Sequence, residues 1–282
     1  MKNPKGLSSY TLCADDFALS TPISETIAQL AVKGCINAIS CMATMPSWPG
    51  DARLLCGIGG DGGAQKPRAV EVGLHLVLAG EQPLTRLSWQ RPDGRLPGAD
   101  ETMMLAYGGQ LDLDQLSREI EAQFVAFITA RGHAPDFVDA HQHVHVFPGI
   151  REIVIAAARR HAPGAWMRNP ADGVGAMLKR PFRGKAFGST LHARGLGKAL
   201  KRAGIAANDS FAGHYDYRGD ESDFAALLPR FFHAAGRRHL IMCHPGAGHL
   251  EEDGIARARI VEAAVIGQMP LTERLAELRA TS

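Results

Sequence analysis

The 282 residues include 31 lysines or arginines against 29 aspartates or glutamates, and the formal net charge of +2 does not indicate a nucleic-acid-binding protein. No window approaches roughly eighteen consecutive apolar residues, so the sequence predicts no membrane span. The five cysteines form no CxxC pair and the first residues lack the apolar stretch of a signal peptide. We therefore expect free thiols and a cytoplasmic protein.

In the first half of the chain, short apolar runs alternate with helical periodicity. Its predicted elements are, in order, a strand at 10–14, a helix at 23–34, a strand at 36–42, a less regular helix within 46–60, a strand at 69–78, a long loop at 79–110 and a helix at 113–131. The strand at 69–78 is nearly all apolar, as a strand covered on both faces should be. His75 interrupts it, and by itself fits a core histidine as well as a metal ligand.

The second half continues the alternation. Its predicted elements are a strand at 137–141, a helix at 148–161, a strand at 165–168, a basic segment at 171–207, a strand at 209–211, a helix at 224–235, a strand at 239–243 and helices at 255–267 and 270–280. From Asp172 to Arg202, eight lysines or arginines face one aspartate. Two interpretations stay open: a solvated helical face, or a patch at 179–202 that contacts an anionic ligand or the surface of a membrane.

The most unusual stretch is Asp139-Ala140-His141-Gln142-His143-Val144-His145, which has a histidine at every second position. Because alternate residues of a strand face the same side, a strand here would point all three histidines into one space. Histidine is the commonest metal ligand among side chains. The stretch therefore predicts a metal site, with a hydrogen-bonded polar strand edge as the alternative.

The order of elements, about seven short strands mostly followed by helices, predicts the α/β class. Polar side chains follow several strands: Asp15-Asp16, His141, Arg168 and His244. A barrel or an open doubly wound sheet would gather them at one end. The absence of GxGxxG after any strand argues against a dinucleotide-binding protein.

Taken together, Asp15-Asp16, His75 and His141 offer a carboxylate and two imidazoles for a divalent ion, with a second carboxylate left as a base. Such a site suits hydrolysis of an amide or an ester, because the ion polarises a carbonyl and acidifies water. His244, at another strand end, is the candidate acid for the leaving amine.

Four motifs resemble the YdjC-like carbohydrate deacetylases, a family that includes a chitooligosaccharide deacetylase branch and a branch linked to hopanoid biosynthesis. They are Ala14-Asp15-Asp16-Phe17, Val72-Gly73-Leu74-His75-Leu76-Val77-Leu78, the histidine stretch at 139–145, and Cys243-His244-Pro245-Gly246. The match runs in the family's order from Leu12 to about Glu262. Ala18 departs from it, since the family usually has glycine there.

The resemblance implies a distorted, TIM-barrel-like (β/α) barrel of about seven strands that forms a single domain over residues 1–282. It also implies a metal-dependent hydrolase that removes the N-acetyl group from an amino sugar. It implies Asp16, His75 and His141 as ligands of a magnesium or zinc ion, Asp15 as the general base, His244 as an acid or oxyanion partner, and Arg168 as the group that orients Asp15. His143 and His145 would line the site, and we add Phe17 and Asp209 to the residues expected to contact substrate. The expected partner is an N-acetylated oligosaccharide or glycolipid; a homo-oligomer stays open.

Two alternatives remain. An amidohydrolase-type hydrolase would use His141 and His143 as an H-x-H metal pair, although in that class the pair normally ends the first barrel strand. A sugar- or lipid-binding protein on a degenerate scaffold would have lost the base or a ligand, whereas Asp15, Asp16 and His75 are all present.

Overall fold

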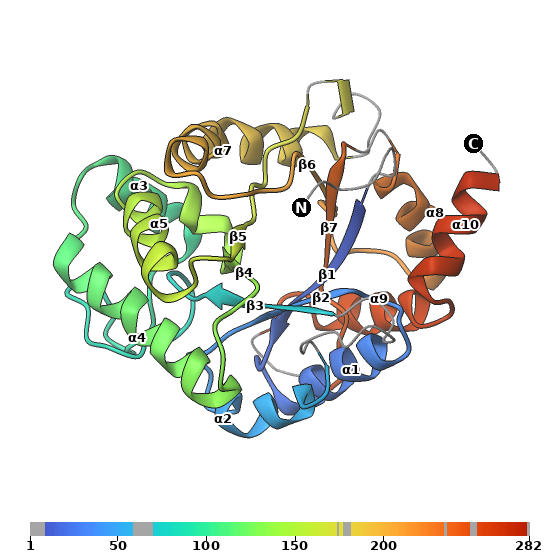
Figure 1. The fold of residues 1–282 in the computed structure, drawn as a ribbon, viewed down its shortest axis with the longest axis horizontal. Coiled ribbons are helices and arrows are strands. Elements are labelled where there is room, and N and C mark those ends of the chain that lie inside the picture. Colours follow the sequence, from blue (N-terminus) through green and yellow to red (C-terminus); the bar gives the residue numbers. More distant parts are fainter. Residues whose placement is uncertain are drawn as a thin grey trace.

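Seven parallel strands form one curled sheet at the centre of the protein (Figure 1). The computed structural model describes residues 9–58, 70–173, 175–176, 182–233, 236–248 and 253–280. The strands are β1 (Ser9–Phe17), β2 (Ala38–Cys41), β3 (Glu71–Leu76), β4 (Phe137–Ala140), β5 (Trp166–Met167), β6 (Ser210–Ala212) and β7 (Arg238–Cys243). Their order is β5-β4-β3-β2-β1-β7-β6, and a parallel bridge from Met167 to Ala207 joins β5 to the residues before β6. The prediction of a barrel-like α/β fold is confirmed.

Helices surround the sheet and connect successive strands (Figure 1). They are α1 (Thr21–Val32), α2 (Trp48–Asp51), α3 (Ala99–Tyr107), α4 (Leu113–Arg131), α5 (Ile150–His161), α7 (Arg183–Ala203), α8 (Glu221–Phe231), α9 (Ala256–Ile266) and α10 (Leu271–Ala280), with 3-10 turns η1 (Ala52–Leu55) and η2 (His141–Val146). No helix in these described ranges is long and apolar enough to cross a membrane.

Helix α4 has the predicted bounds because both of its ends are marked in the sequence. The side chain of Asp112 accepts hydrogen bonds from the backbone N–H groups of Asp114 and Gln115, and Gly132 ends the helix with a φ of 79°. The prediction of an unstructured loop at 79–110 is wrong in part, because α3 lies within it. Its glycines and prolines are confined to the residues before Ala99 and after Tyr107, and good helix formers fill the span between.

Strand alternation divides the sheet into an outer and an inner face. Outward residues such as Leu12, Ile39 and Leu74 pack beneath the helices in the main core. Inward residues form a second, smaller apolar cluster inside the barrel. Its members are Cys13, Ala38, Phe137, Phe211, Leu240 and Met242, with Trp166 packed against them.

A polar layer lies directly above this inner cluster. Two residues further along five of the strand segments, the same inward direction is taken by Asp15, Ser40, His75, Asp139 and Arg168. Because the strands are parallel, their carboxyl ends meet at one end of the barrel, where (β/α) barrels place their sites. The inner apolar cluster therefore forms the floor on which the polar layer rests.

The floor depends on close packing between Gly73 and Phe137. A Cβ atom at Gly73 would lie 2.4 Å from the Phe137 ring, which stacks on Trp166 with ring centroids 4.6 Å apart. We predict that Gly73→Ala lowers the free energy of unfolding by about 1–3 kcal/mol, since overpacking displaces the ring. Chemical denaturation measures this. The control is Gly164→Ala, where a Cβ would meet nothing within 4 Å; equal stability of the two variants would contradict the prediction.

Candidate metal centre and active site

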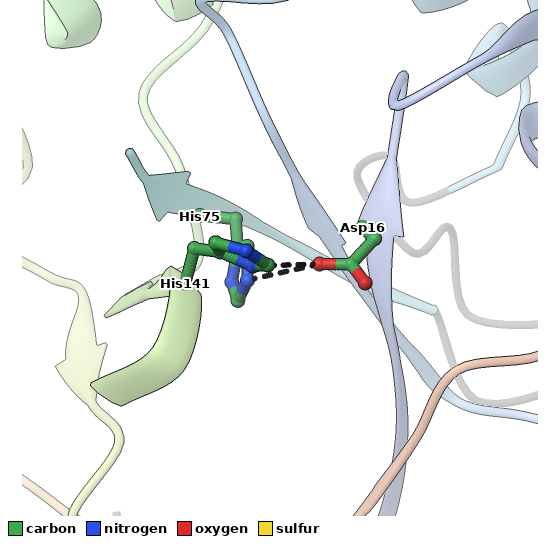
Figure 2. Close-up of side chains that lie close together, drawn as sticks. All are labelled: Asp16, His75 and His141. Atoms are coloured by element: carbon green, nitrogen blue, oxygen red, sulfur yellow. Dashed lines mark hydrogen bonds and ion pairs between the residues drawn. The ribbon is translucent and has the colours of Figure 1, made fainter. Parts of the chain in front are cut away.

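Asp16, His75 and His141 converge at the carboxyl ends of the strands (Figure 2). Oδ1 of Asp16 lies 3.4 Å from Nε2 of His75 and 3.2 Å from Nδ1 of His141. Two ligands bound at about 2.1 Å to one tetrahedral ion are roughly 3.4 Å apart, so these spacings fit ligands of a shared cation. The three side chains come from β1, from β3 and from the residue after β4.

A bulge in β1 brings both aspartates to the same cavity. In a regular strand, adjacent side chains point to opposite faces. Here the pairing of β1 with β2 shifts between Ala14 and Phe17, and Asp16 has a φ of 64°. Aspartate tolerates this left-handed conformation better than most residues. Ala18 is also left-handed, with a φ of 75°, which is a conformation that favours glycine.

The histidine stretch is not a strand, so the expectation that all three histidines point into one space is wrong. It forms the turn η2, in which Gln142 and His143 have φ values of 53° and 59°. His141 therefore faces Asp16, and the ring of His143 lies edge-on to Phe211 at 5.3 Å. His145 is fully buried, with Nε2 2.8 Å from the carbonyl oxygen of Arg168.

His75 has the second hydrogen bond that is typical of metal-binding histidines. Its Nδ1 lies 2.7 Å from Oδ1 of Asp139, which also accepts a hydrogen bond from Ser40. Nε2 is thereby left facing Asp16. Burial alone would lower the pKa of His75, but the charge of Asp139 and the hydrogen bonds to Asp139 and Asp16 outweigh it and raise that pKa to about 10. A cation bound here would displace this proton.

The guanidinium of Arg168 occupies the centre of the polar layer. Nη1 and Nη2 of Arg168 donate to the two carboxylate oxygens of Asp15 at 2.5 and 2.6 Å. Nη2 also pairs with Oδ2 of Asp139 at 2.6 Å and donates to Sγ of Cys13. Cys13, Asp15 and Asp139 would otherwise form a second cluster of ligand-type atoms, but Arg168 already neutralises it.

A second arginine, Arg259 on α9, holds the other side of Asp16. Its Nη2 donates to Oδ2 of Asp16 at 2.7 Å and its Nε donates to Asp253 at 2.6 Å. Burial by itself would raise the pKa of Asp16, but Arg259 and the two histidines outweigh burial and hold that pKa well below its usual range.

The formal charges around Asp16 leave a negative surplus. Four carboxylates (Asp15, Asp16, Asp139 and Asp253) are paired with two guanidinium groups (Arg168 and Arg259). Buried charges are costly unless they are compensated. Once His75 has lost its proton to a bound cation, the surplus of two negative charges matches a divalent ion, and the oxygen and nitrogen donors suit magnesium or zinc.

His244 lies on the same cavity, at the end of β7. Its backbone N–H donates to Oε2 of Glu262, whose Oε1 accepts from the hydroxyl of Tyr215, both at 2.5 Å. Burial lowers the pKa of His244 to about 4, against the opposing charges of Asp16 and Asp15, so the imidazole is neutral near pH 7. Burial also raises the pKa of Glu262, to about 7.

A cavity of about 830 Å³ opens above these residues, within the size range of small-molecule sites. Of the residues predicted from the sequence, it is lined by Asp15, Asp16, His75, His141, His143 and His244. Arg168 is not part of the lining, but it donates hydrogen bonds to Asp15, which is. The lining also includes Glu81, Arg95, Gln142 and Tyr217.

Three residues expected to contact substrate lie outside this lining. Phe17 faces the outer core, edge-on to Trp48. His145 is buried beneath η2. Asp209 precedes β6, and its carboxylate accepts hydrogen bonds from the backbone of Arg237 and Arg238 at the amino-terminal ends of the strands, opposite the cavity.

The sequence prediction missed the partners that hold the site. Asp139 was part of the histidine stretch, and its place between apolar residues of a strand was a signal of a buried, paired carboxylate. Arg259 and Glu262 are three residues apart, so they share one face of α9. In the sequence this spacing looks the same as an exposed ion pair.

The fold and this cluster define a barrel-like α/β protein in which one carboxylate and two imidazoles are close enough together to share a metal ion. The chain belongs to the YdjC-like family, whose model matches residues 10–281. It is 27% identical over 268 residues to a chitooligosaccharide deacetylase of Yersinia pestis strain Pestoides F, covering 94% of this chain and 92% of the relative. A chitooligosaccharide deacetylase of Yersinia pestis bv. Antiqua strain Angola is 29% identical over 218 residues, 76% of each chain.

Among solved structures, a proposed cellobiose-phosphate cleavage protein from Enterococcus faecalis V583 has the same fold. It superposes with a TM-score of 0.71 at 16% identity, over 97% of this chain and 95% of that one.

We predict that adding a divalent metal stabilises protein from which a chelator has first removed any bound metal. A metal at 100 times its dissociation constant raises the free energy of unfolding by about 2.7 kcal/mol. His141→Ala should abolish this gain, and the partly exposed position tolerates the change. Thermal unfolding and calorimetric titration with Mg²⁺ and Zn²⁺ measure the effect. His133→Ala, at an exposed histidine, is the control; an undiminished gain in His141→Ala would contradict the assignment.

Proposed function

We propose that this protein is a metal-dependent carbohydrate deacetylase that hydrolyses the N-acetyl group of an amino sugar. The observation that carries the proposal is the placement of Asp15, fixed by two hydrogen bonds from Arg168, beside the Asp16–His75–His141 cluster in one cavity. Matches to chitooligosaccharide deacetylases over nearly the whole chain support the substrate class. When bound, a divalent ion held by Asp16, His75 and His141 supplies Lewis acidity, which polarises a carbonyl and acidifies water.

Asp15 acts as the general base. Arg168 holds both of its oxygens, and an ionised carboxylate has lone pairs beyond those two hydrogen bonds. One of them accepts the proton of the attacking water. Because Arg168 is buried and cannot lose its proton, Asp15 keeps a constant orientation throughout the reaction.

His244 acts on the leaving nitrogen. Its backbone is fixed by Glu262, and its ring lies 5.4 Å from that of Tyr217, which also lines the cavity. The imidazole is neutral in the free protein, so the proton that it passes to the amine is the one that Asp15 has taken from the attacking water. The imidazole of His143 and the other side chains that line the cavity enclose the space for the sugar.

The geometry does not favour the two alternatives. An H-x-H pair would need His143 beside His141, but the left-handed turn directs His143 toward Phe211 and His214. A degenerate binding protein would lack part of the cluster, whereas the base and all three potential ligands face the cavity.

The direct test is acetate release from a panel of N-acetylated glycans and glycolipids, with metal analysis of the same preparation. We expect release from at least one amino sugar, lost on chelation and restored by Mg²⁺ or Zn²⁺. Binding of N-acetyl sugars without release from any member of the panel would refute the deacetylase and favour a binding protein.

A second prediction concerns the base. Asp15→Asn should lower the rate of acetate release by about 10²–10⁴-fold, the usual contribution of a general base. Stabilisation by metal should persist, because Asp15 is not in the cluster of potential ligands. Steady-state kinetics and metal titration measure the two effects. The control is Asp112→Asn on α4, since asparagine caps a helix as well as aspartate does; full activity of Asp15→Asn would exclude this role.

A further inference from the structure

Helix α7 has an exposed stripe that runs from Phe187 to Arg202. Phe187, Leu191, Arg194 and Lys198 follow one another at intervals of three or four residues, and Lys201 and Arg202 complete the row. This spacing places them on one side of the helix. The opposite side is buried and contributes Ala193, Leu196 and Leu200 to the main core. The stripe is therefore a true outer face, apolar in its first half and cationic in its second.

The apolar half continues onto α3. The hydroxyl of Tyr107 lies 3.0 Å from Nδ1 of His192, so the end of α3 contacts α7 beside Leu191. Met104 is one turn before Tyr107, on the same side of α3. Phe187, Leu191, Met104 and Tyr107 are 52–64% exposed, which is unusual for four large apolar side chains on two neighbouring helices.

The cationic half has no acidic neighbour on its own helix, since α7 contains neither aspartate nor glutamate. Within the described ranges, Arg194, Lys198, Lys201 and Arg202 take part in no ion pair. A basic row that continues directly from exposed apolar residues matches an anionic bilayer, in which the cations meet headgroups and the apolar side chains enter the acyl boundary. Nucleic acid would match the cations but leave the aliphatic side chains without a partner.

This surface begins at the rim of the candidate active site. The side chain of Gln142, which lines the cavity, accepts a hydrogen bond from the backbone of Ala99 at the start of α3. From there α3 runs about 12 Å to Tyr107, at 1.5 Å per residue. A bilayer bound at α3 and α7 would thus lie close to the opening of the cavity.

We infer that the α3–α7 surface, formed by the four apolar side chains and the four cations named above, binds an anionic membrane. The membrane contact stands on the exposed stripe and is independent of the proposed deacetylase function.

The test is flotation of the full-length protein with vesicles of phosphatidylcholine, with or without about one third phosphatidylglycerol. We expect binding to the anionic vesicles and little to the neutral ones, weakened at 0.5 M salt by screening. The double variant Leu191→Ser/Lys198→Gln should bind the anionic vesicles at least about ten-fold more weakly. Roughly five-fold comes from the lost cation and the remainder from the lost apolar side chain.

A matched double variant separates this surface from a general effect of charge and hydrophobicity. Val32→Ser/Lys33→Gln also removes one exposed apolar side chain and one exposed lysine, but at the end of α1, on the other side of the barrel from α7 (Figure 1). It should bind vesicles like the unmodified protein. Equal binding by the two double variants would overturn the inference, and so would equal binding to neutral and anionic vesicles. Absence of vesicle binding would overturn it as well, including the case in which α7 captures a protein partner instead.

Acetate release from a soluble chitooligosaccharide is measured on the same proteins and should be the same in both double variants. No release from any protein, with the vesicle results as expected, would refute the deacetylase and retain the membrane contact. Release of acetate without selective vesicle binding would retain the deacetylase and refute the membrane contact.

Discussion

The structure of the site depends on one buried cation, the guanidinium of Arg168. Fully enclosed in the barrel, it would be strongly destabilising if unpaired, and its ion pairs with Asp15 and Asp139 compensate for the lost hydration. Asp139 in turn holds His75, so the proposed base and one proposed metal ligand share a single positive group. Arg168 pairs with Asp15 directly and reaches His75 only through Asp139.

Asp16 is constrained in a different way. The bulge in β1 turns it toward the cavity, and Arg259, from a helix near the end of the chain, occupies one of its oxygens. The other oxygen is left to His75 and His141. The two arginines thus hold the adjacent aspartates in different environments, as their proposed roles of base and metal ligand require.

The inner apolar cluster and the outer helices contribute separately to function. The cluster closes the barrel below the polar layer, so that Asp139 and Arg168 interact away from water, where electrostatic interactions are stronger. Helix α7 belongs to the outer layer, and none of its described residues lines the cavity. Its exposed face can therefore serve attachment to a bilayer without affecting the chemistry inside the barrel.

Chain order and strand periodicity were enough to predict the α/β class and to place Asp15, His141, Arg168 and His244 at strand ends, and the resemblance to a known family implied the barrel. Parallel strands all end on the same side, so their terminal side chains must meet. The same reasoning explains why Asp209, which precedes a strand, lies at the opposite end. Only the tertiary structure decided the left-handed turns at Asp16 and in η2, because a single reversed φ redirects a side chain without leaving a periodic pattern in the sequence. It also decided that Arg259 and Glu262 enter the site, since the inward face of a helix depends on what it packs against.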